Sequence, residues 1–259
     1  MCTLVVLHRA IPGVPLLVAA NRDEFFGRRA EGPALRRTPG GVAVVAPLDA
    51  RAGGTWLGLS ARGVFAALTN VAGAEPDPAR RSRGLLVLEA LEAGSAREAA
   101  ERARAVSPQA YNPWNLFVGD GREAFAVGST GESRCLHLDP GVHVVGNGAL
   151  DAPPTPKVAR LRERAQRLAG LALPDALAGL SALCRSHERS DPLGSACVHT
   201  ERYGTRSSAL LALGGDESAF HFADGAPCEH EYRLFTPLLQ ELARGTRLLE
   251  GESVARKVS

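Results

Sequence analysis

The sequence lacks any stretch that could cross a membrane and any secretory leader. No run approaches the roughly 18 apolar residues of a membrane-spanning helix, and no basic segment followed by an apolar stretch and a cleavage site opens the chain. The 5 cysteines, an odd number spread over 259 residues, do not follow the pattern of a disulfide framework. We therefore expect a cytoplasmic protein, without a membrane span, in a reducing compartment.

Charge of one sign is not in excess either. The 30 lysines and arginines nearly balance the 28 aspartates and glutamates, and no basic stripe is interleaved with aromatic residues. This argues against nucleic acid and against an anionic membrane as the partner. A glycine-rich phosphate loop, a Gly-x-Ser-x-Gly elbow and a His-Glu-x-x-His motif are absent, so nothing supports the chemistries that those motifs carry.

What is present is the pattern of one large domain over residues 1–259. Hydrophobic residues make up 45% of the chain, which is ordinary for a globular protein of this length. Strand pairs alternate with two pairs of helices, an order that indicates an α+β fold with antiparallel sheets. The expected helices cover residues 82–91, 95–105, 157–171 and 174–184. We also expect a basic loop over residues 25–41, a strand pair at 134–138 and 142–145, a strand at 196–200 and a short terminal helix at 238–243.

The first two dozen residues carry the most specific pattern. Cys2 directly follows the initiator methionine and opens an apolar run, rich in β-branched residues, that predicts a strand. After a Pro-Gly turn, a second apolar run at residues 16–20 ends in Asn-Arg-Asp-Glu at 21–24. An antiparallel hairpin of the two runs brings Cys2 close to this polar tetrapeptide.

A cysteine at a mature N-terminus carries nucleophile and base on one residue. The α-amine has an ordinary pKa of about 7.7 to 8.0 and the thiol of about 8.5, so proton exchange between them costs roughly 1 kcal/mol or less near pH 8. The amine can therefore activate the thiol without a histidine, once the methionine has been removed. The alternative is that Cys2 is a small buried hydrophobic residue of the strand.

Several motifs, spread from residue 1 to about 213, resemble the NRDE proteins, also called the transport-and-Golgi-organisation family. In chain order they are Met1-Cys2, Asn21-Arg22-Asp23-Glu24, Gly53-Gly54-Thr55-Trp56-Leu57-Gly58, Ala67-Leu68-Thr69-Asn70, Gly146-Asn147 with Asp151, and Tyr203-Gly204-Thr205-Arg206-Ser207-Ser208. That family is in turn similar to the choloylglycine hydrolases and penicillin V acylases, N-terminal-nucleophile hydrolases that begin with Met-Cys-Thr. The resemblance implies a four-layer αββα sandwich of two antiparallel sheets.

The resemblance also implies roles for individual residues. Asn70 matches an oxyanion-hole donor, a task that suits a neutral, rigid amide; its alternative role is that of a turn residue bonding its own backbone. Asn147 matches a second polar group that faces the nucleophile. Arg22 and Asp23 would orient Cys2 and tune its amine. In the choloylglycine-type enzymes these two are separated, whereas here they are adjacent and point to opposite strand faces, so we expect only Asp23 to face the site.

Other residues are candidates for substrate binding. Arg206 could pair with Asp23 or bind a substrate carboxylate as a fork. Arg28, in the basic loop, could meet an anionic substrate group or simply be solvated. Trp56 is expected in the core or in the pocket wall.

A metal site is not predicted, and no cofactor is expected. Cys135-x-His137, Cys197-x-His199 and Cys228-x-His230 each place two soft ligands on one strand face, and such pairs could converge. Their spacing along the chain is too wide for a compact metal-binding motif.

We therefore expect a cysteine N-terminal-nucleophile amidohydrolase or acyltransferase that acts on a small non-peptide or acyl-amino amide through a Cys2 acyl-enzyme. The alternative, which the resemblance also implies, is a non-catalytic cytosolic carrier of haem or of acyl-CoA and lipid. The partner is then a small molecule, such as an anionic amide, an acyl-CoA or haem.

Overall fold

Two antiparallel sheets pack face to face in the computed structural model, which describes residues 2–73, 75–214 and 217–245 with side chains and the backbone of 246–255. Sheet 1 has the strand order β10-β1-β2-β11-β12-β13 and sheet 2 the order β3-β4-β5-β6-β7-β8-β9. The strands of sheet 1 are β1 (Thr3–Ile11), β2 (Val14–Phe25), β10 (Gly141–Val145), β11 (Tyr203–Leu213), β12 (Ala219–Ala223) and β13 (Arg233–Leu234). Those of sheet 2 are β3 (Ala30–Arg37), β4 (Ala43–Asp49), β5 (Leu57–Ser60), β6 (Phe65–Asn70), β7 (Trp114–Gly119), β8 (Ala124–Ser129) and β9 (Ser133–His137).

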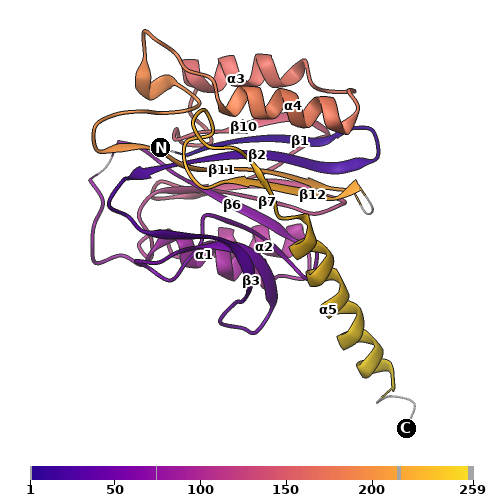
Figure 1. Cartoon of the computed structure of the whole chain (residues 1–259). Helices are drawn as coiled ribbons and strands as arrows, with labels where there is room; N and C mark the ends of the chain where they lie inside the picture. The colour runs from indigo at the N-terminus through magenta and orange to yellow at the C-terminus, as the bar shows by residue number, and fades with distance from the viewer. Residues whose placement is uncertain (1, 74, 215–216, 256–259) are drawn as a thin grey trace.

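Helices cover the outer face of each sheet (Figure 1). The pair α1 (Arg83–Leu91) and α2 (Ala96–Arg104) packs on sheet 2, and the pair α3 (Pro156–Gln166) and α4 (Leu173–Cys184) packs on sheet 1. Three apolar clusters fill the spaces between the four layers: one between the sheets and one under each helix pair. The predicted four-layer αββα sandwich is thus confirmed.

The first hairpin is apolar on both faces because it lies inside the sandwich. Leu4 and Val6 of β1 point into the space between the sheets, whereas Val5 and Leu7 point toward α3 and α4. Strands buried on both faces have continuous apolar runs instead of alternating ones. The predicted pairing of β1 and β2 is confirmed, with Thr3 opposite Asn21.

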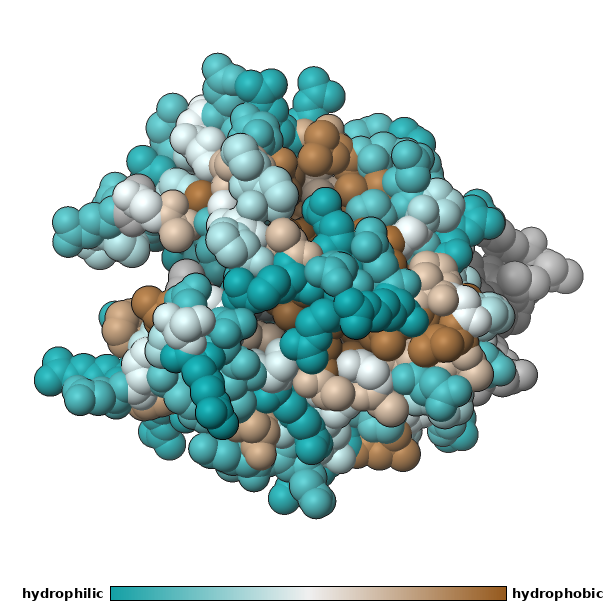
Figure 2. All heavy atoms as spheres, turned by 90° about the horizontal axis from the view of Figure 1, so that it is seen from above, coloured by the Kyte–Doolittle hydropathy of each residue, from teal (hydrophilic) through white to brown (hydrophobic). Residues whose placement is uncertain are grey.

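The outer face above α3 and α4 is mainly hydrophilic, with hydrophobic side chains showing only in scattered patches (Figure 2). On α3 the inward side is formed by Val158, Leu161 and Ala165, which are all buried. This is the amphipathic pattern of a helix that covers a sheet.

Three expectations about strands are wrong. The expected loop at residues 25–41 contains the edge strand β3, which pairs with β4. The expected pair at 134–138 and 142–145 is split, because β9 ends sheet 2 and β10 ends sheet 1. Residues 196–200 form only an isolated bridge, His199 to Gly204, instead of a strand.

The last helix, α5 (Thr236–Ala255), is longer than the short terminal helix predicted at 238–243. Leu239 and Leu242 anchor its start in the cluster between the sheets, and the rest extends away from the sandwich (Figure 1). Within the described part of the chain, no helix has both the length and the apolar character needed to span a bilayer.

Candidate functional site

The Asn-Arg-Asp-Glu and Tyr-Gly-Thr-Arg-Ser-Ser motifs are neighbours in sheet 1. They form the end of β2 and the start of β11, which run antiparallel with Tyr203 opposite Phe25, Thr205 opposite Asp23 and Ser208 opposite Asn21. A register shift between Thr205 and Ser207 marks a bulge at this point. Bulges re-aim side chains and are frequent beside functional sites.

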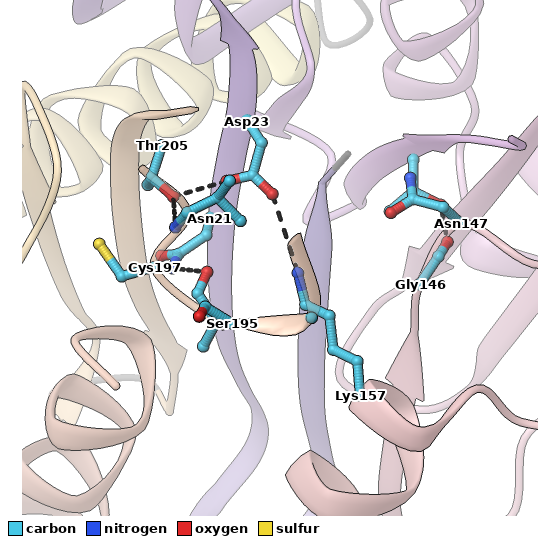
Figure 3. A network of polar contacts seen from close by, with 12 residues as sticks. Asn21, Asp23, Gly146, Asn147, Lys157, Ser195, Cys197 and Thr205 are labelled. Atoms are coloured by element: carbon cyan, nitrogen blue, oxygen red, sulfur yellow. Dashed lines mark hydrogen bonds and ion pairs between the residues drawn. The ribbon is translucent and has the colours of Figure 1, made fainter. Parts of the chain in front are cut away.

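Hydrogen bonds across this pair fix the tetrapeptide in place (Figure 3). The Thr205 hydroxyl donates to Asp23 Oδ1 at 2.6 Å, and the Tyr203 hydroxyl donates to the Asp23 carbonyl at 2.9 Å. The Ser208 hydroxyl donates to Asn21 Oδ1 at 2.6 Å, while Asn21 Nδ2 donates to the carbonyls of Cys184 and Ala196, at 2.9 Å each. Asn21 is therefore a structural link to the helical layer.

Asp23 faces a buried lysine that the sequence did not single out. Lys157 Nζ, on the first turn of α3, lies 3.9 Å from Asp23 Oδ2; the lysine side chain is 12% exposed and the carboxylate side chain 0% (Figure 3). Burial raises the pKa of the Asp23 carboxyl to about 6, against the opposing effects of Lys157 and the Thr205 hydrogen bond. Burial also lowers the pKa of Lys157. The sequence predicted a helix from residue 157, but it did not reveal what this first lysine contacts.

Arg206 is not the partner of Asp23, contrary to one of the two expectations for it. Its guanidinium lies 5.8 Å from the centre of the Phe26 ring, and its buried Nε has no hydrogen-bond partner among the described residues. It does not line the cavity described below, so the structure places it apart from the other candidate residues.

Cys2 lines a cavity of about 370 Å³ at the same end of the sandwich. Arg22 lines this cavity too, whereas Asp23 is turned toward the helices; this is the reverse of the orientation that we expected for the pair. The guanidinium carbon of Arg22 lies 4.3 Å from the centre of the Trp56 ring, and Trp56 forms part of the cavity wall. A cation stacked on an aromatic face is stabilised by the ring quadrupole.

The surroundings of Cys2 favour the protonated thiol over the thiolate. Its burial raises the pKa, and the nearby Asp23 carboxylate adds to this effect. The backbone N–H of Asp23 and the guanidinium of Arg22 act in the opposite direction, because both favour the thiolate. The thiol therefore needs a base when it acts as a nucleophile.

Cations predominate around the cavity. Among the described lining residues are 6 arginines and 3 acidic residues; the arginines are Arg22, Arg28, Arg51, Arg80, Arg81 and Arg83. Arg28 is held by Asp49, with Nε at 3.0 Å from Oδ2, so its charge is already partly balanced. The side chain of Arg51 makes no hydrogen bond or ion pair with another described residue. Residues 80–83 were not predicted as site residues, although their cluster of basic residues directly before a helix was a visible signal.

A contact between two glycines positions the start of α1 beside the cavity. A Cβ added to Gly54 would lie 2.5 Å from the carbonyl carbon of Gly84, so the two backbones touch, and the Thr55 N–H donates to the Gly84 carbonyl at 3.1 Å. Gly53 precedes this contact with a φ of +69°, which favours glycine. The motif at 53–58 thus sets the position of Arg83 in the cavity wall.

The two asparagines occupy different positions. Asn70, at the end of β6, lines the cavity, and it also lines a smaller adjoining cavity together with Asn147. Asn147 Nδ2 donates to the Asn70 carbonyl at 2.6 Å, and the Ala72 N–H donates to the Asn147 carbonyl at 2.8 Å. Asn147 therefore lies behind Asn70 instead of lining the main cavity beside Cys2, where it was expected.

Comparison with known sequences gives a consistent set of relatives. A sequence model of the family Transport and Golgi organisation 2 matches residues 1–224. The Transport and Golgi organization 2 homolog of Mus musculus is 34% identical over 149 residues, which cover 53% of this chain and 52% of the relative. The corresponding protein of Bos taurus is 31% identical over 232 residues, 78% of this chain and 83% of the relative. The chain thus spans about half the length of the mouse relative and most of the bovine one.

Comparison with solved structures finds the same architecture in acylases. Penicillin V acylase from Agrobacterium tumefaciens has a TM-score of 0.54 at 14% identity, covering 86% of this chain and 83% of its own. A mutant of the conjugated bile acid hydrolase from Clostridium perfringens has a TM-score of 0.53 at 12% identity, covering 91% and 96%. At such identities the similarity shows that the fold is shared, and nothing about activity.

Proposed function

The chain belongs to the Transport and Golgi organisation 2 family and has the fold of the N-terminal-nucleophile acylases, and from these two premises we propose that it is a cysteine amidohydrolase or acyltransferase. Its substrate is a small amide with an anionic group, and the acyl part is carried on Cys2. The observation that carries the proposal is the position of the Cys2 thiol in an arginine-lined cavity, next to the hydrogen-bonded end of β2.

In the proposed reaction, removal of Met1 frees the α-amine of Cys2. The amine accepts the thiol proton while the sulfur attacks the amide carbonyl, and a C–S bond forms. The same amine then gives the proton to the leaving nitrogen as the C–N bond breaks, which yields a thioester and a free amine. Water, or a second amine, attacks the thioester and releases the acyl group. Because burial raises the pKa of the thiol, the sulfur needs this base to become a nucleophile.

The tetrahedral intermediate needs a donor for its oxyanion. The Asn70 side-chain amide is the proposed donor, since it belongs to a cavity-lining residue and is neutral. Asn147 is proposed as a positioning residue, because its own amide is engaged by the Asn70 carbonyl. Asp23 would act on the Cys2 amine from the helical side of the strand, while Arg22 acts on the sulfur from the cavity side.

Intact-mass spectrometry and thiol labelling test the proposal. We expect a mass that lacks Met1 and selective labelling of Cys2 by a β-lactone or iodoacetamide probe. Cys2→Ala should lose both the labelling and the hydrolysis of N-acyl amino acids, whereas Cys135→Ser, which alters an exposed thiol on β9, should keep both.

A retained methionine would overturn the proposal, because the nitrogen of Cys2 would then be an amide and not a base. Labelling of Cys2 without turnover of any amide, combined with one-to-one binding of haem or an acyl-CoA, would point to a carrier instead.

A further inference from the structure

Four side chains with nitrogen or sulfur ligands converge outside the cavity. His187 follows α4, Cys197 and His199 precede β11, and Cys228 lies between β12 and β13. One ligand atom from each lies within 4.8 Å of all the others. Segments separated by up to 41 positions in the sequence thus supply one compact set of donors.

The distances match the size of a tetrahedral zinc site. Zinc–sulfur bonds of about 2.3 Å and zinc–nitrogen bonds of about 2.0 to 2.1 Å place neighbouring ligand atoms about 3.3 to 3.8 Å apart. The Cys197 and Cys228 sulfurs are 3.5 Å apart. His199 Nε2 lies 3.5 Å from the first sulfur and 3.1 Å from the second.

An oxygen atom lies near the outer ring nitrogen of each histidine, at hydrogen-bond distance for His187. His187 Nδ1 lies 3.0 Å from the Cys197 carbonyl, which can only accept, so Nδ1 carries the proton and Nε2 remains free to ligate. His199 directs Nε2 toward the sulfurs, and its Nδ1 lies 3.9 Å from Glu229 Oε1. Histidines that bind zinc usually donate their other ring N–H to a carboxylate or a backbone carbonyl.

We propose that these four residues bind a structural zinc ion. Two thiols lose their protons on binding, so two thiolates balance the charge of Zn²⁺ and the histidines complete the tetrahedron. Four protein ligands leave no open position for catalysis. Soft sulfur ligands favour zinc over magnesium, calcium and manganese. This proposal departs from our expectation from the sequence, in which no metal site was predicted.

Only some of the Cys-x-His pairs in the sequence contribute residues to this site. The Cys197-x-His199 pair contributes both residues, whereas Cys228-x-His230 contributes only the cysteine. Cys135-x-His137 lies on β9 of the other sheet, and His187 belongs to no such pair. The cluster depends on tertiary contacts, which the spacing along the chain does not reveal.

The ion would hold residues 197–199 in place, and this segment supports Asp23 through Thr205. Val198, between the two ligands, donates its N–H to the Thr205 hydroxyl at 2.9 Å and accepts from the Thr205 N–H at 2.8 Å. Thr205 in turn holds the Asp23 carboxylate. The proposed zinc is thus structural, and its loss loosens one side of the tetrapeptide at the end of β2.

Elemental analysis of the full chain, purified without chelators, tests this proposal. We expect about one zinc per chain in the wild type, and release of that zinc when the thiols are titrated with a mercurial reagent. Cys228→Ser and His187→Ala should each lower the zinc content at least about tenfold, whereas the matched control Cys135→Ser should keep it. Because a ligand variant can fail to fold, the wild type is also loaded with Co²⁺, whose visible absorption reports tetrahedral coordination with thiolate ligands.

Three results would overturn the proposal. One is a wild type without zinc after incubation with excess Zn²⁺ under reducing conditions. Another is unchanged zinc content in Cys228→Ser. The third is a mass that shows a disulfide between Cys197 and Cys228 in protein prepared under reducing conditions. None of these results depends on whether Cys2 is a nucleophile, so failure here leaves the proposed amidase activity to its own test.

Discussion

Adjacent side chains at the end of β2 face two different environments. Arg22 lines the cavity and stacks on Trp56, whereas Asp23 is fully buried against the helical layer beside Lys157. The strand geometry requires this alternation. An acid and a base thus lie close in sequence without forming a pair with each other.

Lys157→Met should destabilise the protein in a pH-dependent way. The pKa of Asp23 is about 6 in the folded chain, which is higher than in the unfolded chain. Asp23 therefore contributes most to the free energy of unfolding at low pH, and this contribution is lost as the pH rises through about 6. Without the lysine, the ionised carboxylate loses the cation that lies 3.9 Å from its Oδ2. The free energy of unfolding should therefore fall by about 3 kcal/mol at pH 8, and by much less at pH 5.

Urea unfolding of both proteins at pH 5 and pH 8 measures this difference. Arg164→Met is the matched control, because it removes an exposed cation from the same helix, and it should change stability by less than about 1 kcal/mol at either pH. An equal loss at both pH values for Lys157→Met would show that the lysine does not pair with the ionised carboxylate.

Alkylation of Cys2 should still accelerate between pH 8 and pH 9. Burial holds the pKa of its thiol above the ordinary value, so the reactive thiolate remains a minor species at neutral pH. The rate of iodoacetamide labelling, followed by peptide mass spectrometry with Cys2→Ala as the blank, checks this. A rate that reaches its plateau below pH 8 would mean that the thiol is activated before any substrate arrives.

For single residues, the sequence predicted which residues form the site better than it predicted which way their side chains point. Cys2, Asn70 and Trp56 line the cavity as candidates from motifs, yet the choice between Arg22 and Asp23 depends on which face of β2 turns toward the helices. The strand is apolar on both sides, so its hydrophobic pattern carries no information on this point. Lys157 contacts Asp23 only through the packing of α3 on sheet 1.

Among the helices and strands, the position of α1 depends on a contact between two glycines. Gly54→Ala should lower the free energy of unfolding by about 1 to 3 kcal/mol, because its Cβ would meet the Gly84 backbone at 2.5 Å and neither segment can yield without moving the helix. Thermal unfolding measures this loss. Gly27→Ala is the control, since an added Cβ has no neighbour within 4 Å there; similar losses in both variants would exclude the contact as the cause.

The elements themselves were largely predictable, but their partners were not. In the structure, side-chain caps begin α2 and α3, since Ser95 and Thr155 each accept a backbone N–H of the first turn. The edge strand β3 was missed because it contains glycine, proline and three charged residues. The strands β9 and β10 follow each other closely in the sequence, yet a short connection does not determine whether two strands pair or separate into different sheets.

For the whole molecule, local charge matters more than net charge. The chain has a formal net charge of only +2, but the cavity wall has 6 arginines and 3 acidic residues among the described lining residues. The affinity for an N-acyl amino acid should therefore weaken when salt is raised from about 0.05 to 0.5 M, and that of an uncharged analogue should not. Calorimetry at both ionic strengths checks this.

Arg51→Gln should weaken binding of the carboxylate-bearing ligand by about two- to fivefold, because its exposed guanidinium has no competing partner among the described residues. Arg164→Gln, an exposed cation outside the cavity, serves as the control and should leave the affinity unchanged. Equal effects of the two changes would indicate a general response to protein charge.

The two-sided strand β2 also bears on how such a protein can diverge. Arg22 and Glu24 at its end line the cavity, while Asn21 and Asp23 are held by buried hydrogen-bond partners on the other side. Ligand preference can therefore drift through substitutions on one side of a single chain segment while the other side keeps the segment in place, so that new specificities arise without rebuilding their support.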